Sequence, residues 1–200
     1  MKKLFVLFVA SLAGGLALAS PYPAVVSNAY VIARNAGVYV NVFCTNESLS
    51  NGEELNFEMA LLRNDVRQLM GCGSCYLDVN PSGRCGSSAN VIATNTWHTF
   101  KVSCDTKFNI TMDGKTVRTF MGSETKDAFF ILGMYNMPKN RFYAALRRVW
   151  VENDGKIIRD YRPCNLDGVS VLFDVINKKY AIVGRLGNEH TLEYGVGDPW

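Results

Sequence analysis

Hydrophobic and polar positions alternate with a period of two along much of this 200-residue chain. Such alternation is typical of β-strands that bury one face. It is clear at Val38, Val40 and Val42, and again from Leu55 to Leu62. The segment from Leu62 to Met70 is ambiguous, because its apolar residues also fit about one and a half turns of a helix. The pattern therefore predicts a chain built mainly of strands.

Turn signals divide these strands into hairpins. The segment from Phe108 to Phe120 has Asp113-Gly114 between two strand-like halves, which is the composition of a two-residue β-hairpin. The segment from Phe142 to Gly184 repeats this arrangement, with turns at residues 153–155, 167–168 and 177. Pro163 follows the first of these turns, and we expect strand pairing to stop at its nitrogen, which has no hydrogen.

The spacing of the turns predicts the fold class. About twelve strands and little helix are expected, with turn signals roughly 8–12 residues apart, as in a β-sandwich. We therefore expect an all-β fold, a single antiparallel β-sandwich. Residues 20–200 contain no linker, repeat or low-complexity tract, and their length suits one domain. Residues 20–35 should form a short lead-in strand, and residues 195–200 a loose end.

Residues 1–19 have the pattern of a cleavable signal peptide. Lys2-Lys3 precede an apolar run from Leu4 to Leu18, and Ala17-Leu18-Ala19 supplies the small residues of a cleavage site. The run is shorter than the ~20 residues that a transmembrane helix needs, which argues against a membrane anchor. We expect a secreted protein, extracellular or periplasmic, whose mature part has no membrane span.

The net charge argues against one class of partner. The sequence has 21 basic and 18 acidic residues, a net charge of +3. Without Lys2 and Lys3 the basic residues number 19 and the net charge is +1. Because nucleic-acid binding requires a concentrated basic face, a nucleic-acid partner is not expected.

Secretion also decides how the cysteines are interpreted. All six lie after residue 19, and an even number in an oxidising compartment favours disulfides among Cys44, Cys72, Cys75, Cys85, Cys104 and Cys164. The alternative is a zinc site in which Cys72 and Cys75 form a knuckle that Cys85 and Cys104 complete. Secretion, the presence of only two histidines and the lack of a second C-x-x-C motif favour disulfides, whose pairing stays open.

Two parts of the sequence resemble LamG-like domains of secreted bacterial and phage-tail proteins, which belong to the concanavalin A-like lectin and glucanase jelly rolls. The central part has Trp97-His98, followed by a strand pair around Asp113-Gly114. The C-terminal part has Ile158-Arg159-Asp160-Tyr161, Pro163, Gly168, Leu172-Phe173-Asp174 and Tyr180. The resemblance extends over residues 91–184 and implies a jelly-roll fold. In parts of the family a calcium ion is bound, but its ligands cannot be mapped onto this sequence.

The sequence lacks the acidic motif of the catalytic branch of this superfamily. Glucanases place their carboxylates on one strand, as E-x-D-x-x-E or E-x-D-x-E, so that two of them flank a glycosidic bond. Glu152-Asn153-Asp154 is the only E-x-D here, and it falls on a turn. No nucleophile elbow, phosphate-binding loop or dinucleotide fingerprint occurs. We interpret His98 and His190 as strand or surface residues, and we do not expect an enzyme.

Binding is the remaining class of function. Sugars are held by aromatic rings and by amide or carboxylate groups, and loops at one rim of a sandwich supply both. Two loops carry such residues, and the candidates are Tyr76, Asp78, Asn80, Tyr135, Asn136 and Asn140. Tyr76 and Tyr135 also suit the edge of the core.

The leading hypothesis is a secreted, non-catalytic module that binds a glycan or another surface ligand. A structural or protein-binding module is the second hypothesis. The third is a glycoside hydrolase that would act through Glu58, a residue expected to face water or a concave surface.

Overall fold

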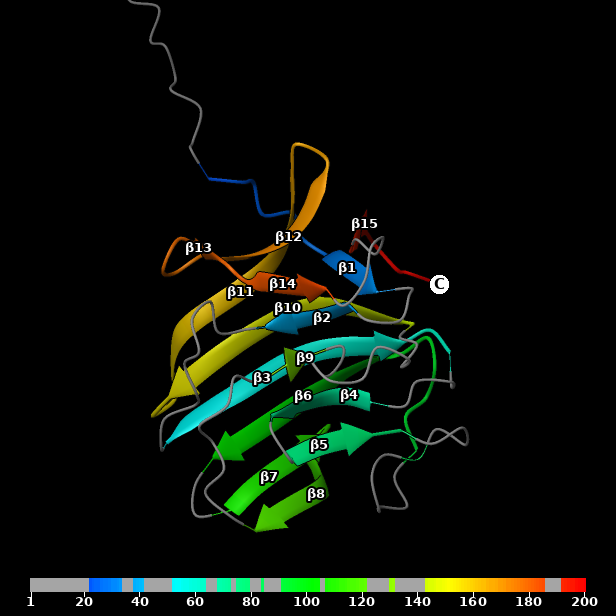
Figure 1. Ribbon diagram of the computed structural model, residues 1–200, viewed down its shortest axis with the longest axis vertical. Coiled ribbons are helices and arrows are strands. Elements are labelled where there is room, and N and C mark those ends of the chain that lie inside the picture. The colour runs from blue at the N-terminus through cyan, green and yellow to red at the C-terminus, as the bar shows by residue number, and fades with distance from the viewer. Residues whose placement is uncertain are drawn as a thin grey trace, which may run out of the picture.

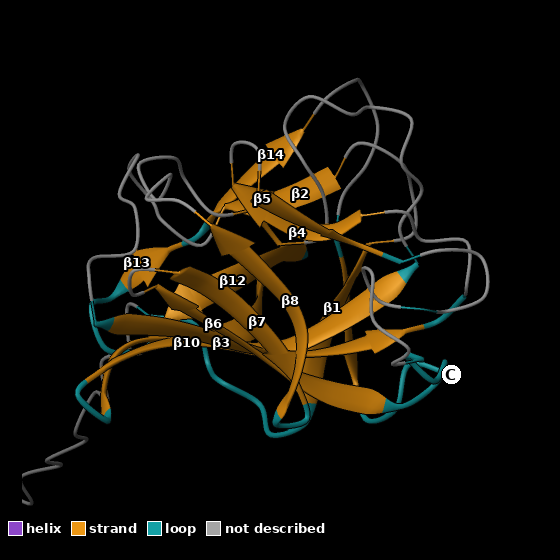
Figure 2. Cartoon of the chain, turned by 90° about the horizontal axis from the view of Figure 1, so that it is seen from below, coloured by secondary structure: helices purple, strands orange, loops and turns teal. Residues whose placement is uncertain are grey.

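The computed structural model describes residues 22–33, 38–41, 52–63, 68–72, 75–79, 84, 91–104, 107–121, 130–131, 143–185 and 192–200. In these residues the chain forms fifteen strands, arranged in two sheets that lie one over the other (Figure 1, Figure 2). Neighbouring strands in both sheets pair antiparallel. The predicted all-β antiparallel sandwich is therefore confirmed. No helix in the described part of the chain is long and apolar enough to span a bilayer.

The larger sheet has ten strands. Eight of them follow the order β13, β12, β11, β10, β3, β6, β7, β8, while β1 pairs with β10 and β15 pairs with β1. Their bounds are β1 (Ala29–Ala33), β3 (Glu53–Leu61), β6 (Trp97–Cys104), β7 (Lys107–Met112), β8 (Lys115–Met121), β10 (Ala144–Asn153), β11 (Lys156–Leu166), β12 (Val169–Asp174), β13 (Lys179–Tyr180) and β15 (Glu193–Val196).

The smaller sheet has five strands in the order β14, β2, β9, β4, β5. Their bounds are β2 (Val38–Asn41), β4 (Gln68–Cys72), β5 (Cys75–Asp78), β9 (Phe130–Ile131) and β14 (Ile182–Arg185). Part of the ambiguous segment before residue 70 is thus strand, since β4 includes Gln68 to Met70; residues 64–67 lie outside the described part.

The core lies between the inner faces of the two sheets. From the large sheet, Phe57 of β3 and Phe100 of β6 stack with their ring centroids 5.1 Å apart and their planes 7° from parallel. Leu69 and Leu77 of the small sheet are likewise fully buried. Burying each such side chain contributes roughly 1.5–3 kcal/mol, so the alternation along β3 supplies much of the driving force for the sandwich.

The tight turns occur where their sequences predict them. Asp113-Gly114 joins β7 to β8, Asp154-Gly155 joins β10 to β11, and Asp167-Gly168 joins β11 to β12. In each pair both residues have positive φ, with the aspartates near 50° and the glycines at 73° to 86°. Two-residue hairpins need this backbone conformation because its twist matches that of the flanking strands.

Strand β11 continues through Pro163, contrary to the prediction that pairing would stop there. Its pairing with β10 ends at Tyr161, whereas its pairing with β12 runs from Tyr161 to Leu166. A proline lacks only its own N–H, and beyond Tyr161 strand β11 has a ladder partner on one edge alone. The missing donor therefore does not interrupt the strand.

The C-terminal end is also more ordered than its sequence suggests. β15 pairs with β1, and Gly195 lies opposite Tyr30. A Cβ atom at position 195 would collide with the Tyr30 ring, so the aromatic ring occupies the space that the glycine leaves open. The prediction of a loose end is wrong for Gly195 and Val196, because the pairing partner lies more than 160 residues away in the sequence.

Cys164 is a correction to the expected set of disulfide-bonded cysteines. It is a free thiol on β11 with no exposed surface, and its Sγ lies 3.6 Å from the carbonyl oxygen of Arg162. Burial raises the pKa of its thiol. Cys72 and Cys75 lie directly opposite each other in the β4–β5 hairpin. The side chains of Cys72, Cys75 and Cys104, and all of Cys44, Cys85 and residues 1–19, lie outside the described part.

We expect the Cys164 thiol to react with iodoacetamide only after unfolding. Burial shields the sulfur and its raised pKa keeps thiolate scarce, and the thiolate is the nucleophile. Peptide mass spectrometry after labelling at mildly alkaline pH, with and without denaturant, measures this directly. The variant Cys164→Ala should lose only this one labelled site. A disulfide-linked peptide containing Cys164 would contradict the assignment.

Candidate functional site

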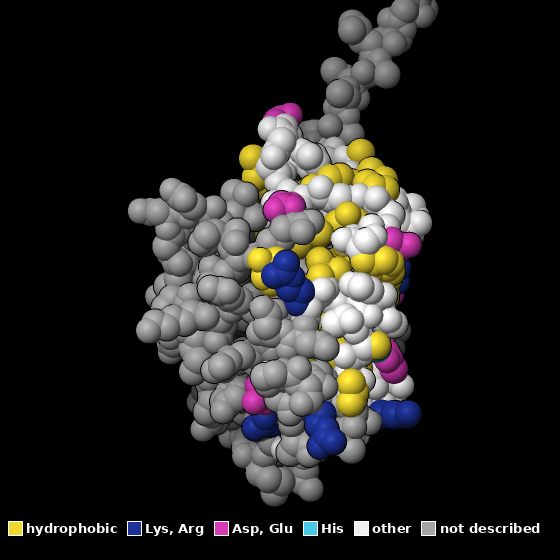
Figure 3. Space-filling model, turned by 90° about the vertical axis from the view of Figure 1, so that its right-hand side faces the viewer, with side chains coloured by type: hydrophobic (Ala, Val, Ile, Leu, Met, Phe, Trp, Pro, Cys, Tyr) yellow, Lys and Arg dark blue, Asp and Glu magenta, His cyan; other side chains and the backbone are white. Residues whose placement is uncertain are grey.

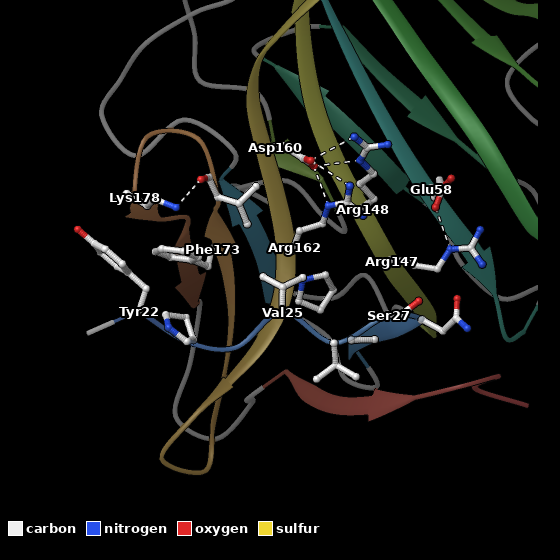
Figure 4. Close-up of a pocket in the computed structure, with 16 residues that line it drawn as sticks. Tyr22, Val25, Ser27, Glu58, Arg147, Arg148, Asp160, Arg162, Phe173 and Lys178 are labelled. Atoms are coloured by element: carbon white, nitrogen blue, oxygen red, sulfur yellow. Dashed lines mark hydrogen bonds and ion pairs between the residues drawn. The ribbon is translucent and has the colours of Figure 1, made fainter. Parts of the chain in front are cut away.

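A groove of about 810 Å³ opens on the face of the large sheet that points away from the core (Figure 4). It lies at the point where one edge of β10 stops pairing with β1 and starts pairing with β11. Ala144 to Leu146 pair with β1, whereas Val149 to Asn153 pair with β11. The opposite edge of β10 pairs with β3 throughout. The groove is therefore built at the junction of β1 and β11, and the segment 22–28 that leads into β1 forms one of its walls.

A β-bulge in β10 turns two consecutive arginines toward the groove. Leu146 pairs with Met59 and Arg148 pairs with Glu58, so Arg147 is an extra residue in the register. Leu146 and Val149 are both fully buried, while the side chains of Arg147 and Arg148 are 33% and 23% exposed. A bulge of this kind re-aims a side chain that alternation would otherwise send into the core.

Asp160 on β11 fixes two guanidinium groups at once (Figure 4). Nε of Arg148 donates to its Oδ1 at 2.9 Å, and Nε of Arg162 forms an ion pair with the same oxygen, also at 2.9 Å. Nη2 of Arg148 and Nη2 of Arg162 donate to its Oδ2 at 3.1 and 3.0 Å. The Asp160 side chain is only 11% exposed, so these charge-assisted hydrogen bonds form largely out of water.

Asp174 holds the backbone of β11 in place beside this cluster. Its Oδ1 accepts hydrogen bonds from the backbone N–H groups of Asp160, Ile176 and Asn177, and its Oδ2 accepts one from the Asn177 amide. The carboxylate is 1% exposed and is thus satisfied by the turn after β12. Asp174 therefore fixes the turn after β12 and ties it to β11.

The third arginine has its own carboxylate and its own aromatic partner. Nε of Arg147 donates to Oε2 of Glu58 at 2.8 Å, and its guanidinium lies 4.6 Å from the centre of the Trp97 ring. Arg148 lies in the same way over Trp150, at 4.5 Å. Glu58 therefore faces the outer side of the sheet, as its place in the alternation predicted, and the indole rings restrict both arginines.

The other end of the groove is apolar. Phe173 of β12 packs against Tyr22, with ring centroids 5.6 Å apart, and against Tyr180 at 5.2 Å. Lys178 places its ammonium 5.3 Å from the Tyr22 ring and donates to the carbonyl oxygen of Val175. Tyr22, Phe173 and Lys178 line the groove, whereas Tyr180 does not. One cavity thus joins an aromatic wall to a charged floor.

The structure locates one side chain of the six binding residues predicted from sequence. Oδ1 of Asp78 accepts a hydrogen bond from Nη1 of Arg118 at 2.9 Å, which links β5 of the small sheet to β8 of the large one. Asp78 does not line the groove. Tyr76 lies in β5, with its side chain outside the described part, and Asn80, Tyr135, Asn136 and Asn140 lie outside it entirely. That set stays a prediction.

The remaining candidates for chemistry have structural partners. Nδ1 of His98 lies 2.7 Å from Oδ2 of Asp113, and its Nε2 lies 3.3 Å from the carbonyl oxygen of Ala93. Glu152 accepts a hydrogen bond from the Trp150 indole at 2.7 Å. Among the described residues, no three His, Cys, Asp or Glu side chains form a group able to hold a metal ion. His190 lies outside these residues, and calcium binding stays a prediction.

The groove arginines were missed by the sequence reasoning, although a local signal exists. In Leu146-Arg147-Arg148-Val149 two consecutive charged residues separate two apolar ones, which breaks the period of two. In a strand that is otherwise alternating, such a break indicates a bulge. Asp160 and Phe173 appeared only as motif residues, since nothing in their own segment shows that residues 22–28 lie beside them.

We expect Asp160→Ala to destabilise the fold by about 2–3 kcal/mol, because two partly buried guanidinium groups would lose their shared counter-charge; removing one member of a fully buried pair costs ~3–5 kcal/mol. Urea unfolding measures this free energy. The control Glu54→Gln breaks the more exposed pair with Lys101, whose side chains are 35% and 42% exposed, and should cost less than ~1 kcal/mol. Equal losses of unfolding free energy in the two variants would show that the Asp160 ion pairs stabilise the fold no more than an exposed pair does.

The comparisons with known proteins bear on the fold. No protein-family model matches the chain, and neither does any curated protein. A solved structure of a candidate carbohydrate-binding protein from Bacteroides ovatus is similar, with a TM-score of 0.55 and 12% identity over 86% of this chain. The alignment covers 60% of that protein, so this chain spans less than two thirds of its length.

A second similar structure is the heptameric SAP-like pentraxin from Limulus polyphemus. Its TM-score is 0.45 and its identity 8%, with 79% of this chain and 95% of the pentraxin covered. The likeness to the Bacteroides ovatus protein is distant in sequence and concerns the arrangement of the strands. The chain has an all-β fold of the concanavalin A-like lectin type.

Proposed function

We propose that this chain is a non-catalytic binding module that recognises a carbohydrate in the groove at the β1–β11 junction. The observation that carries the proposal is the combination of the exposed aromatic ring of Tyr22, backed by the buried Phe173, with a floor of hydrogen-bonding groups in one 810 Å³ groove. A pyranose ring needs both, because its C–H face is apolar and its rim carries hydroxyls. The likeness to a candidate carbohydrate-binding protein from Bacteroides ovatus supports the same class of ligand.

The arrangement of the carboxylates supports binding over hydrolysis. A glycosidase needs one carboxylic acid to protonate the leaving oxygen and a second carboxylate as base or nucleophile. Glu58 and Asp160 both line the groove, but each accepts hydrogen bonds from arginine. Neither is presented as a proton donor, so the groove has the charge pattern of a recognition site.

The sequence supports three further parts of the proposal. The pattern of residues 1–19 supports secretion, to the cell exterior or the periplasm. The motifs in residues 91–184 support a relationship to LamG-like domains within the wider fold group. The ligand would then be a glycan on a cell surface or in a matrix, with calcium as an accessory ion only if the protein follows that part of the family.

We expect Tyr22→Ala to weaken glycan binding about tenfold while the protein stays folded. Tyr22 is 44% exposed and forms the groove wall, and stacking on an aromatic ring contributes about 0.5–1.5 kcal/mol. The matched control is Tyr180→Ala, because Tyr180 also packs on Phe173 but lies outside the groove. Titration calorimetry with sugars selected from a glycan array gives both affinities. Absence of binding at millimolar sugar, or equal losses in both variants, would overturn the proposal.

A protein-binding module is the second candidate, and the β11–β12 hairpin favours it. The hairpin extends beyond the body of the sandwich (Figure 1), and Leu166 and Val169 face each other at its tip, 36% and 59% exposed. Hydrophobic side chains also gather toward the upper end of the molecule on the face shown in Figure 3. Exposed apolar tips of this kind are typical of contact surfaces.

If the hairpin is the contact surface, Val169→Asp should abolish cross-linking to a partner in the native medium, while Tyr22→Ala leaves it intact. The charge would have to be buried without a counter-ion in the interface. The control Ile176→Asp changes another exposed apolar residue, in the turn after β12. Cross-linked products can be resolved by mass spectrometry, and their persistence in Val169→Asp would exclude the hairpin.

A further inference from the structure

The charges that line the groove do not balance. Four cations line it, namely Arg147, Arg148, Arg162 and Lys178, but only two carboxylates do, Glu58 and Asp160. The sequence as a whole has a net charge of only +3, so this local excess of two positive charges is a property of the groove. A concave site with an excess of one sign attracts ligands of the opposite sign.

The arginines keep donor groups that the protein does not use. Arg148 and Arg162 each bind Asp160 through Nε and Nη2, and Arg147 binds Glu58 through Nε. Within the described part of the chain, Nη1 of Arg148 and of Arg162 and both Nη atoms of Arg147 have no hydrogen-bond partner. A guanidinium has five N–H donors in a planar fork, so each of these groups retains donors for a ligand.

The protein has already oriented these groups. Asp160 holds two forks side by side, while Trp97 and Trp150 lie against the guanidinium groups of Arg147 and Arg148. Because their rotamers are restricted before a ligand arrives, little conformational entropy is lost on binding. Arginine forks match the spacing of oxygens in carboxylate and sulfate groups, and such bonds are roughly twice as strong as neutral ones.

We propose that the groove selects sugars that carry an oxyanion, a carboxylate or a sulfate ester, and binds that group with Arg148 and Arg162, assisted by Arg147. The inference rests on the proposed carbohydrate-binding function and adds the class of sugar. The oxyanion offsets the excess charge, while the exposed Tyr22, which packs on the buried Phe173, receives the apolar face of the ring. A neutral sugar would instead leave the desolvated arginine donors with weaker acceptors.

The test compares ligands that differ only in charge. The probes are an oligogalacturonide and its methyl ester, and a sulfated galactan oligosaccharide and its desulfated form, titrated into the purified protein. We expect at least one acidic probe to bind about tenfold more tightly than its neutral counterpart, since a charged hydrogen bond is worth roughly 1.5–3 kcal/mol. Whichever pair shows the preference identifies the oxyanion as carboxylate or sulfate.

Three variants distinguish recognition by the arginine hydrogen-bond donors from attraction by positive charge alone. Arg162→Gln should remove most of the preference for the acidic probe, and Arg148→Lys should reduce it even though the charge is kept. Lys101→Gln removes a positive charge from a pair with Glu54, away from the groove, and should leave the preference unchanged. If an arginine variant does not fold, the comparison of acidic and neutral probes on the unaltered protein still decides.

The outcomes distinguish the inference from the function on which it rests. If acidic and neutral probes bind equally and Tyr22→Ala weakens both, the groove binds sugars but does not select an oxyanion. If Lys101→Gln lowers the preference as much as Arg162→Gln, general electrostatic attraction is responsible and the assignment to the arginine pair is wrong. If no sugar binds, both the function and the inference are wrong.

Discussion

The alternation of side chains along β10 constrains the whole large sheet. The strand pairs with β3 along one edge, and along the other it pairs first with β1 and then with β11. Leu146 and Val149 must both enter the core, but they are an odd number of residues apart. In a regular strand one of them would face outward. The extra residue at Arg147 resolves this conflict, and the groove forms beside it.

The parts of the fold that depend on neighbouring residues could be predicted from the sequence. Asp113-Gly114, Asp154-Gly155 and Asp167-Gly168 form the turns that their composition indicates, because a backbone with positive φ is a local requirement. The alternation of Phe57 and Met59 likewise identified the inner face of β3.

The parts that depend on distant residues could not. β15 is a strand only because β1 offers a free edge, and the proline in β11 is tolerated because one of its edges has no ladder partner there. The groove requires four segments to meet: residues 22–28, Glu58 of β3, the bulge in β10 and the base of the β11–β12 hairpin with the turn that follows it. No sequence pattern within any one of these segments predicts that they lie together, although the two consecutive arginines indicate the bulge.

Two buried polar side chains of the described sandwich, Asp174 and His98, serve the fold itself. Asp174 accepts four hydrogen bonds from β11 and from its own turn, and His98 is held between Asp113 and Ala93. Buried polar groups without such partners would cost stability, so these contacts explain why the residues are there. The groove differs, because its cations outnumber the carboxylates that hold them.

The wall at Tyr22 and Pro23 has a practical consequence for anyone handling the protein. Both residues line the groove a few positions before β1, so anything attached directly before Tyr22 starts at the opening. An affinity tag or fusion partner attached there would lie close to the groove and would obstruct the binding of a ligand.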